Sequence, residues 1–83
     1  MGDRAKTPAE AFGQVLRELR ERKGLTQEAL ALEAGTERSH ISDLERGKKG
    51  PSLRTILSLA RALGVSAGEI VSMVEERTLQ KRR

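Results

Sequence analysis

The chain contains no cysteine, tryptophan or tyrosine, and it has only one phenylalanine and one histidine. The absence of cysteine excludes disulfide bonds, thiol nucleophiles and cysteine-ligated metals. A single histidine leaves little from which to build a metal centre or a base-activated nucleophile. We therefore expect no metal, no cofactor and no catalytic residues, and we predict a binding protein rather than an enzyme.

Long apolar segments are also missing. No run approaches the ~18 apolar residues of a membrane span, and the first residues have no apolar stretch that would serve as a signal peptide. We therefore expect a cytoplasmic protein without a membrane partner. Its 83 residues are enough for one small domain with one core.

Positive charge is what the chain has in excess. Sixteen Lys and Arg residues oppose twelve Asp and Glu residues, which gives a net charge of +4. A basic surface attracts phosphate groups, although many basic proteins are merely well solvated. The charge favours a nucleic-acid partner without establishing one.

Helix signals recur along the sequence, and nothing has the alternation of a strand. Hydroxyl residues precede apolar residues at helical spacing, and glycines follow them. The first predicted helix covers about 8–23 after Thr7, and a short second helix lies between Thr26 and Gly35. The third is capped by Thr36 and reaches about Arg46. The fourth lies between Ser52 and Gly64, and the fifth runs from Ser66 to Glu76. We expect an all-α domain over residues 8–76, with a flexible segment at 1–7 and a basic tail at 77–83.

The third predicted helix has an unusual outward face. Ile41 and Leu44 point inward, whereas the opposite side carries short polar residues. Short side chains let a backbone approach a partner closely, and an arginine reaches past them. The outward set is Ser39, Ser42, Asp43 and Arg46, with Thr36 near the start and Arg38 and His40 at the flanks.

The stretch LTQEALALEAGTERSHISDLERGKKGPSLRTILSLARALGVS resembles the helix-turn-helix domains of phage Cro and repressor proteins, the XRE family. The resemblance rests on spaced motifs, which are Gln27, Leu30-Ala31, Gly35, Ile41-Ser42, Leu44-Glu45-Arg46-Gly47, Pro51-Ser52-Leu53 and Ala62-Leu63-Gly64-Val65-Ser66. It implies a compact five-helix domain of the lambda-repressor type. Its third helix would lie in the major groove of double-stranded DNA, usually as a dimer on a near-palindromic operator.

The resemblance also implies which residues read bases. Arg38, Ser39 and Asp43 occupy the positions that meet base edges. Arg38 suits guanine O6 and N7, Asp43 suits cytosine N4, and Ser39 suits either. His40 is a further candidate, with a solvent-facing or backbone-bonded imidazole as the alternative.

A second group is predicted to contact phosphates. Gln27 occupies the family position that binds a phosphate and braces the base-reading residues, and the alternative is a bond to the backbone of its own first turn. For Ser42, the alternative to phosphate contact is a hydrogen bond to a carbonyl of its own helix. For Lys48 and Lys49, the alternative is that they are simply solvated. The group comprises Gln27, Thr36, Ser42, Arg46, Lys48 and Lys49.

Glu45 is assigned differently. It sits at the edge of the buried stripe, and the resemblance pairs it with Arg20. We predict a structural ion pair whose loss weakens the fold before it alters sequence preference.

The small core argues for association. One aromatic residue and many alanines limit burial in a monomer, so we expect a homodimer whose interface includes Leu59, Val71, Met73 and Val74. The predicted function is a transcriptional regulator, of the kind found among repressors, restriction-modification controllers and antitoxins. The alternative is a module for which DNA binding is secondary and a protein partner binds around Leu32 and the fifth helix.

Overall fold

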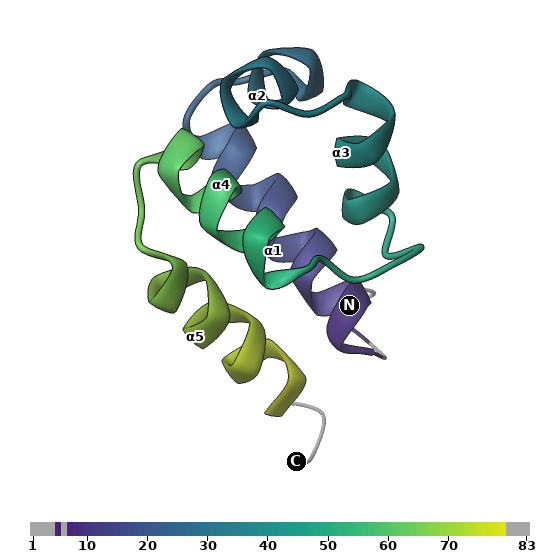
Figure 1. Ribbon diagram of the computed structural model, residues 1–83. Coiled ribbons are helices and arrows are strands. Elements are labelled where there is room, and N and C mark those ends of the chain that lie inside the picture. The colour runs from purple at the N-terminus through teal and green to yellow at the C-terminus, as the bar shows by residue number, and fades with distance from the viewer. Residues whose placement is uncertain (1–4, 6, 80–83) are drawn as a thin grey trace.

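The computed structural model describes Ala5 and residues 7–79, and all of its regular structure is helical in that part of the chain. The five helices are α1 (Pro8–Arg22), α2 (Gln27–Ala34), α3 (Arg38–Glu45), α4 (Leu53–Leu63) and α5 (Ala67–Leu79) (Figure 1). The expected all-α class with five helices is confirmed.

Four helices begin as the sequence predicts, because a hydroxyl accepts a hydrogen bond from the backbone N–H three residues later. The acceptors are Thr7, Thr26, Ser52 and Ser66, with N···O distances of 3.0 to 3.1 Å.

The prediction that Thr36 caps α3 is wrong. Glu37 is the N-cap residue, and its side chain makes no capping bond. Thr36 instead belongs to the turn, because its N–H donates to the carbonyl of Ala31 at 2.9 Å. That bond closes the end of α2 around Gly35, whose φ of 73° favours a residue without a Cβ.

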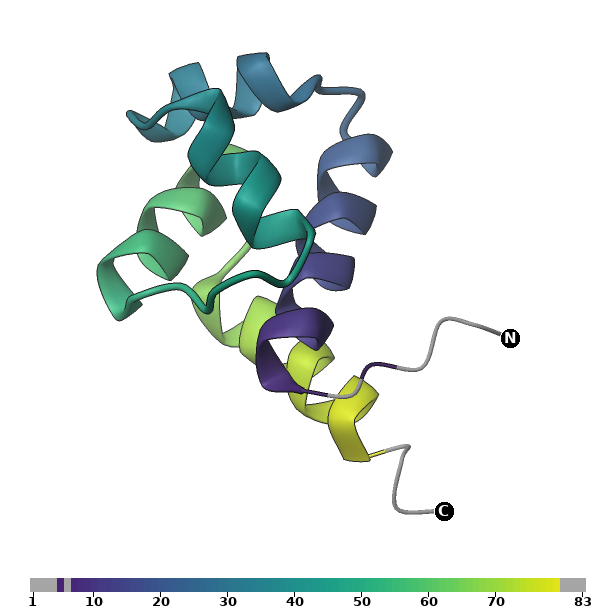
Figure 2. The same ribbon diagram turned by 90° about the vertical axis from the view of Figure 1, so that its right-hand side faces the viewer.

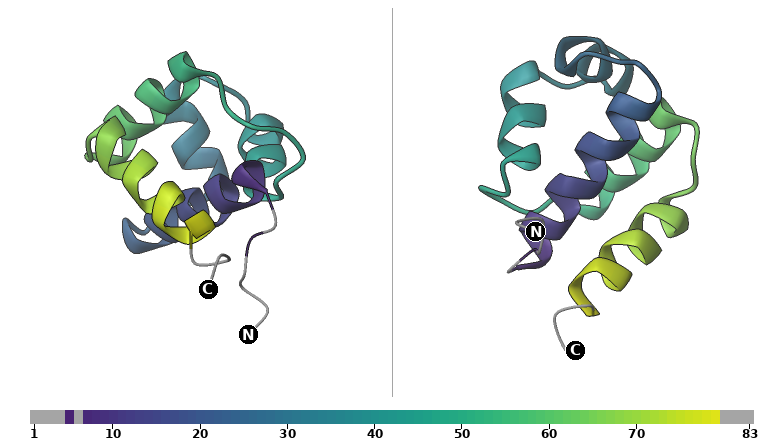
Figure 3. Two further views of the ribbon diagram at one scale, coloured as in Figure 1. Left: turned by 90° about the horizontal axis from the view of Figure 1, so that it is seen from below. Right: turned by 180° about the vertical axis from the view of Figure 1, so that it is seen from behind.

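The helices enclose one core. α5 runs back along α1 and also packs on α4, α2 packs between α3 and α4, and α3 packs on α1 (Figures 1 and 2). Seen from behind, α1 crosses in front of α4 (Figure 3). The largest fully buried side chains are Val15, Leu16, Leu30, Ile41, Leu44, Leu59 and Ile70.

Burial corrects part of the predicted dimer interface. Leu59 is 1% exposed and belongs to the core of the monomer, so it is not available to a second copy. Met73 and Val74 are partly buried and pack against the same core. Of the four predicted interface residues, Val71 alone is exposed.

The C-terminal end of α3 lies unusually close to α1. A Cβ on Gly13 would stand 2.5 Å from the carbonyl oxygen of Leu44 and 2.6 Å from that of Glu45. These are backbone atoms that cannot rotate away, so a glycine is required for the approach. Gly13 therefore allows the end of α3 to pack directly against the backbone of α1.

α5 extends three residues beyond the predicted boundary at Glu76. Arg77 donates to Gln14 Oε1 at 3.2 Å and to Glu18 Oε1 at 2.8 Å, which fastens this turn to α1. Residues 77–79 are therefore helical rather than part of a tail, and residues 80–83 lie outside the described part. In the segment predicted to be flexible, Ala5 is buried, and residues 1–4 and 6 lie outside the described part.

Among the described helices, none is by itself both long and apolar enough to cross a membrane. Taken together, α4 and α5 have the length and apolar composition of a membrane span, but the chain bends by 109° between them.

Candidate nucleic-acid interface

The outward face of α3 combines exposed and half-exposed polar residues. Arg38, Ser39 and Arg46 are exposed, and Ser42 and Asp43 are half-buried. Ile41 and Leu44 on the opposite side are fully buried. The helix is thus anchored by two apolar residues and presents a short polar surface to the outside.

Arg38 is held by Gln27 at the start of α2. Arg38 Nη1 donates to Gln27 Oε1 at 2.9 Å, and Gln27 Nε2 donates to Glu45 Oε1 at 3.0 Å. A carboxylate only accepts, so Glu45 requires the NH2 end of the amide and leaves the carbonyl end for Arg38. The alternative in which Gln27 bonds the backbone of its own turn is not what the structure contains.

Arg20 and Glu45 form the ion pair that the sequence predicts. Arg20 Nε lies 2.6 Å from Glu45 Oε2, and Arg20 Nη2 lies 3.1 Å from Oε1. Arg20 Nη1 also donates to the carbonyl of Leu25 at 2.7 Å. The side chains are 11% and 4% exposed, and the hydrogen bond with Glu45 raises the pKa of Arg20 above its ordinary value.

These contacts form a continuous chain from the interior to the surface. It runs from Arg20 on α1 through Glu45 on α3 and Gln27 on α2 to Arg38 at the start of α3. Each of these hydrogen bonds involves a charged group, and each limits the conformations open to the next side chain in the chain of contacts. The position of an exposed guanidinium is therefore linked to a buried ion pair.

Asp43 has a partner on its own helix. Arg46 Nη2 lies 3.0 Å from Asp43 Oδ1. The hydrogen bond from Arg46 lowers the pKa of Asp43, and the charges of Lys48, Arg46 and Lys49 lower it further. The carboxylate is therefore ionised and satisfied within the free protein.

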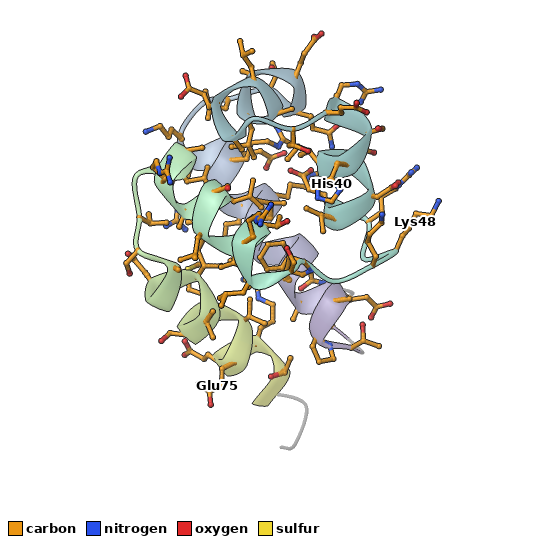
Figure 4. The ribbon with its side chains drawn as sticks, in the orientation of Figure 1. His40, Lys48 and Glu75 are labelled. Carbon is orange, nitrogen blue, oxygen red and sulfur yellow. The ribbon has the colours of Figure 1, made fainter. Side chains whose placement is uncertain are left out.

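Two loop lysines continue the basic surface beyond α3. Lys48 and Lys49 are exposed, and Lys48 points away from the body of the molecule (Figure 4). His40 lies on the opposite flank, where it faces α4 (Figure 4). The structure thus separates His40 from the other outward residues of α3.

Comparison with known proteins shows which family has this arrangement of helices. Residues 16–70 match the helix-turn-helix family. The HTH-type transcriptional regulator y4dJ of Sinorhizobium fredii is 45% identical over 58 residues, which are 70% of this chain and 75% of the relative.

Two solved structures have the same fold. The clp gene regulator ClgR of C. glutamicum superposes with a TM-score of 0.80 at 32% identity, over 87% of this chain and 94% of that one. The restriction-modification controller protein C.AhdI of Aeromonas hydrophila has a TM-score of 0.73 at 48% identity, over 75% of this chain and 94% of that one.

The chain belongs to the XRE family of helix-turn-helix DNA-binding domains. The two helices that define the motif are α2 and α3, joined by the turn at Gly35. The family is one of transcriptional regulators, so the chain is a DNA-binding regulator and not an enzyme.

Sequence reasoning missed two features of this helix-turn-helix unit. Asp43 and Arg46 are three residues apart on one helix, a spacing that favours an ion pair, yet Arg46 was assigned to phosphate alone. The link between Gln27 and Glu45 joins residues 18 positions apart. No local pattern signals such a contact, because it depends on how α2 and α3 pack.

Proposed function

We propose that the chain is a sequence-specific regulator that binds a near-palindromic operator as a homodimer, with α3 in the major groove. The observation that carries the proposal is the hydrogen-bonded chain that holds Arg38 at the start of α3. A side chain that reads a base must be held in place before binding, since ordering it later costs entropy. The solved structures similar to this chain, a gene regulator and a controller protein, agree with this role.

Base reading is assigned to three residues on the first two turns of α3. Arg38 presents a fork of donors that suits guanine, Ser39 suits either partner, and Asp43 suits cytosine N4. Asp43 must exchange its bond with Arg46 for one with the base. His40 faces α4, so it stays outside this base-reading set.

Phosphate contact is assigned to residues on α3, at the start of α2 and in the loops on both sides of α3. Lys48 and Lys49 extend from the loop that follows the helix, and Arg46 becomes available when Asp43 turns to a base. These contacts position the protein without carrying sequence information. The complete set is Gln27, Thr36, Ser42, Arg46, Lys48 and Lys49.

The dimer surface is assigned to the apolar face shared by α4 and α5. Leu53, Leu57 and Val71 are 71%, 52% and 47% exposed. Beside them lies an apolar groove, lined in part by Phe12, Ile56, Val71 and Val74. A two-fold related copy would bury both the protruding leucines and the groove.

The test is selection of bound duplexes from a random pool at ~150 mM salt, a condition that suppresses purely electrostatic binding. An inverted repeat with half-sites about one helical turn apart is the expected result. Recovery of no motif would overturn sequence-specific binding and would favour a protein partner instead, for which Leu32, 83% exposed on α2, is the leading contact.

A further inference from the structure

A small polar hollow lies where the α2–α3 turn, α3 and α4 meet. Its polar lining consists of Thr36, His40, Arg54, Thr55 and Ser58, and its volume is about 200 Å³. None of the described residues that line it is aspartate or glutamate. His40 lies on the side of α3 that faces this region (Figure 4). The hollow is therefore rich in hydrogen-bond donors and free of negative side chains.

The side chains around the hollow have few partners of their own. Of the eight arginines whose side chains the structure describes, six donate to a carboxylate, an amide or a carbonyl, and Arg54 and Arg61 do not. Within the same described part, the side chains of Thr36, His40 and Ser58 make no hydrogen bond either.

The capping geometry explains why the hydroxyls of Thr36 and Thr55 can still donate. Thr36 does not cap α3, because its backbone closes the preceding turn instead. The Thr55 hydroxyl accepts from Ser52 Oγ at 3.0 Å, so its own hydrogen can still be donated. The hollow thus combines one fixed positive charge with hydroxyl and imidazole donors.

We propose that this hollow binds a phosphate-type oxyanion. A guanidinium, hydroxyls and an imidazole N–H can all donate to phosphate oxygens, and the guanidinium can do so with two parallel bonds. Since a water takes up ~30 Å³ in the liquid, the hollow has room for a phosphate group together with a few waters.

The anion has two chemically equivalent sources. One is a backbone phosphate of the bound duplex, in which case the inference rests on the proposed DNA binding. The other is a free phosphate-bearing molecule, which would act as an effector. In both cases the anion would bridge His40 on α3 and Arg54 on α4, and so would fix the reading helix relative to α4.

The first experiment titrates inorganic phosphate into the DNA-free protein at constant ionic strength, with backbone amides followed by two-dimensional NMR. Saturable shifts at Gly35, Thr36, His40 and Ser58 are expected in the wild type. Arg54→Gln should weaken the affinity at least about tenfold, because it removes the charge-assisted bonds. Arg61→Gln removes an equally unpaired arginine from the same helix outside the hollow, and it should bind like the wild type.

The second experiment measures operator affinity against salt for the same proteins. If the ligand is a duplex phosphate, Arg54→Gln lowers the slope of log affinity against log salt by about 0.9 relative to Arg61→Gln. If the ligand is a free anion, that slope is unchanged. Saturating phosphate then alters operator affinity in the wild type and in Arg61→Gln, but not in Arg54→Gln.

Ser58→Ala tests whether the phosphate binds in the hollow itself, because Ser58 is a second donor in its lining. It should weaken the same phosphate interaction by about threefold, because one donor is lost while the charge stays. An effect of Arg54→Gln without any effect of Ser58→Ala would place the anion elsewhere and overturn the proposal. Absence of saturable phosphate binding, with the same salt slope for both arginine variants, would also overturn it while operator binding itself remained intact.

Discussion

Glu45 accepts a hydrogen bond from Gln27, with 3.0 Å between Oε1 and Nε2, while its carboxylate is also paired with Arg20. Gln27 in turn holds Arg38 through the other end of its amide. One buried carboxylate therefore serves both the packing of α3 and the orientation of a residue proposed to read bases. Under the proposed base reading by Arg38, this contact couples stability to recognition.

Loss of the Glu45 carboxylate should destabilise the domain strongly. Glu45→Ala leaves the largely buried guanidinium of Arg20 with only the exposed carboxylate of Glu21, 4.0 Å away, as a charge partner, which costs about 3 kcal/mol, the lower end of the range for breaking a buried pair. Urea denaturation followed by circular dichroism measures this free energy. Glu33→Ala removes an exposed carboxylate with no ion pair in the described part, and should change stability by no more than about 0.5 kcal/mol. Equal losses in the two variants would contradict a structural role for the Arg20–Glu45 pair.

Gln27 and Arg38 should act together in operator binding. In a double-mutant cycle of Gln27→Ala and Arg38→Ala, the two losses of binding free energy should differ from additivity by about 1 kcal/mol. The reason is that Gln27 contributes partly by holding Arg38. The matched cycle of Gln27→Ala with Lys48→Ala should be additive. Additivity in both cycles would show that the bond between Gln27 and Arg38 does not persist on DNA.

Arg38 and Lys48 should affect binding in different ways. Arg38→Ala should cost about 1–3 kcal/mol on the preferred operator and relax the preference at one base position. Lys48→Ala should weaken all sequences alike and reduce the salt slope by about one. Affinities for a set of single-base operator variants at several salt concentrations measure both effects. A uniform loss for both variants would refute the division between base reading and phosphate contact.

Asp43 should contribute stability that acid removes. Its pKa in the folded protein lies below the unfolded value of about 3.9, because Arg46 stabilises the charged form. Between the folded and the unfolded pKa of Asp43, the unfolded state binds more protons than the folded state. The stability that Asp43 contributes therefore rises with pH and is lost as the pH falls through this range. Thermal melts of wild type and Asp43→Asn should therefore converge on acidification below about pH 4.

The control compares Asp43 with Asp43→Asn in proteins that both carry Arg46→Gln. The hydrogen bond that causes the main part of the pKa shift is absent there, so the pH-dependent difference should largely disappear. A difference between wild type and Asp43→Asn that grows toward acid pH would reverse the predicted sign.

A charge on the apolar face of α4 and α5 should disrupt the dimer. Val71→Glu places a carboxylate beside the apolar groove and should raise the dimer dissociation constant at least about tenfold, or about 1.4 kcal/mol. Sedimentation equilibrium over a concentration series measures the constant. Leu32→Glu alters a more exposed leucine on α2 and should leave association unchanged. A wild-type protein that stays monomeric, both free and on operator DNA, would remove the dimer from the proposal.

Most of the helix boundaries could be predicted because their signals are local. A Thr or Ser hydroxyl reaches an N–H three residues away, and a glycine ends the helix within one turn. The end of α5 could not be predicted in this way. It depends on Arg77, which bonds to Gln14 and Glu18 more than 50 positions earlier in the chain.

The sequence predicted the two faces of the third helix and the Arg20–Glu45 pair, but not the other contacts around α3. The period of the third helix placed Ile41 inward and Ser39 and Asp43 outward, and the family motif indicated Arg20 and Glu45 as partners. Thr36 was misplaced because two local roles competed for it, as cap of one helix and as closing residue of the turn before it. The hollow beside His40 and Arg54 has no sequence signature, since it is formed by separate helices.

The sequence by itself determined the five helices and the inward face of α3, because these follow from residues within a few positions of one another. It also indicated the family, through motifs spaced along residues 27–66. Only the tertiary structure decided that Leu59 is buried within the monomer, that Gly13 brings α1 against α3, and that Glu45 reaches Arg38 through Gln27. The physical reason is distance along the chain. Burial and side-chain pairing are set by the packing of whole helices, which no short stretch of sequence encodes alone.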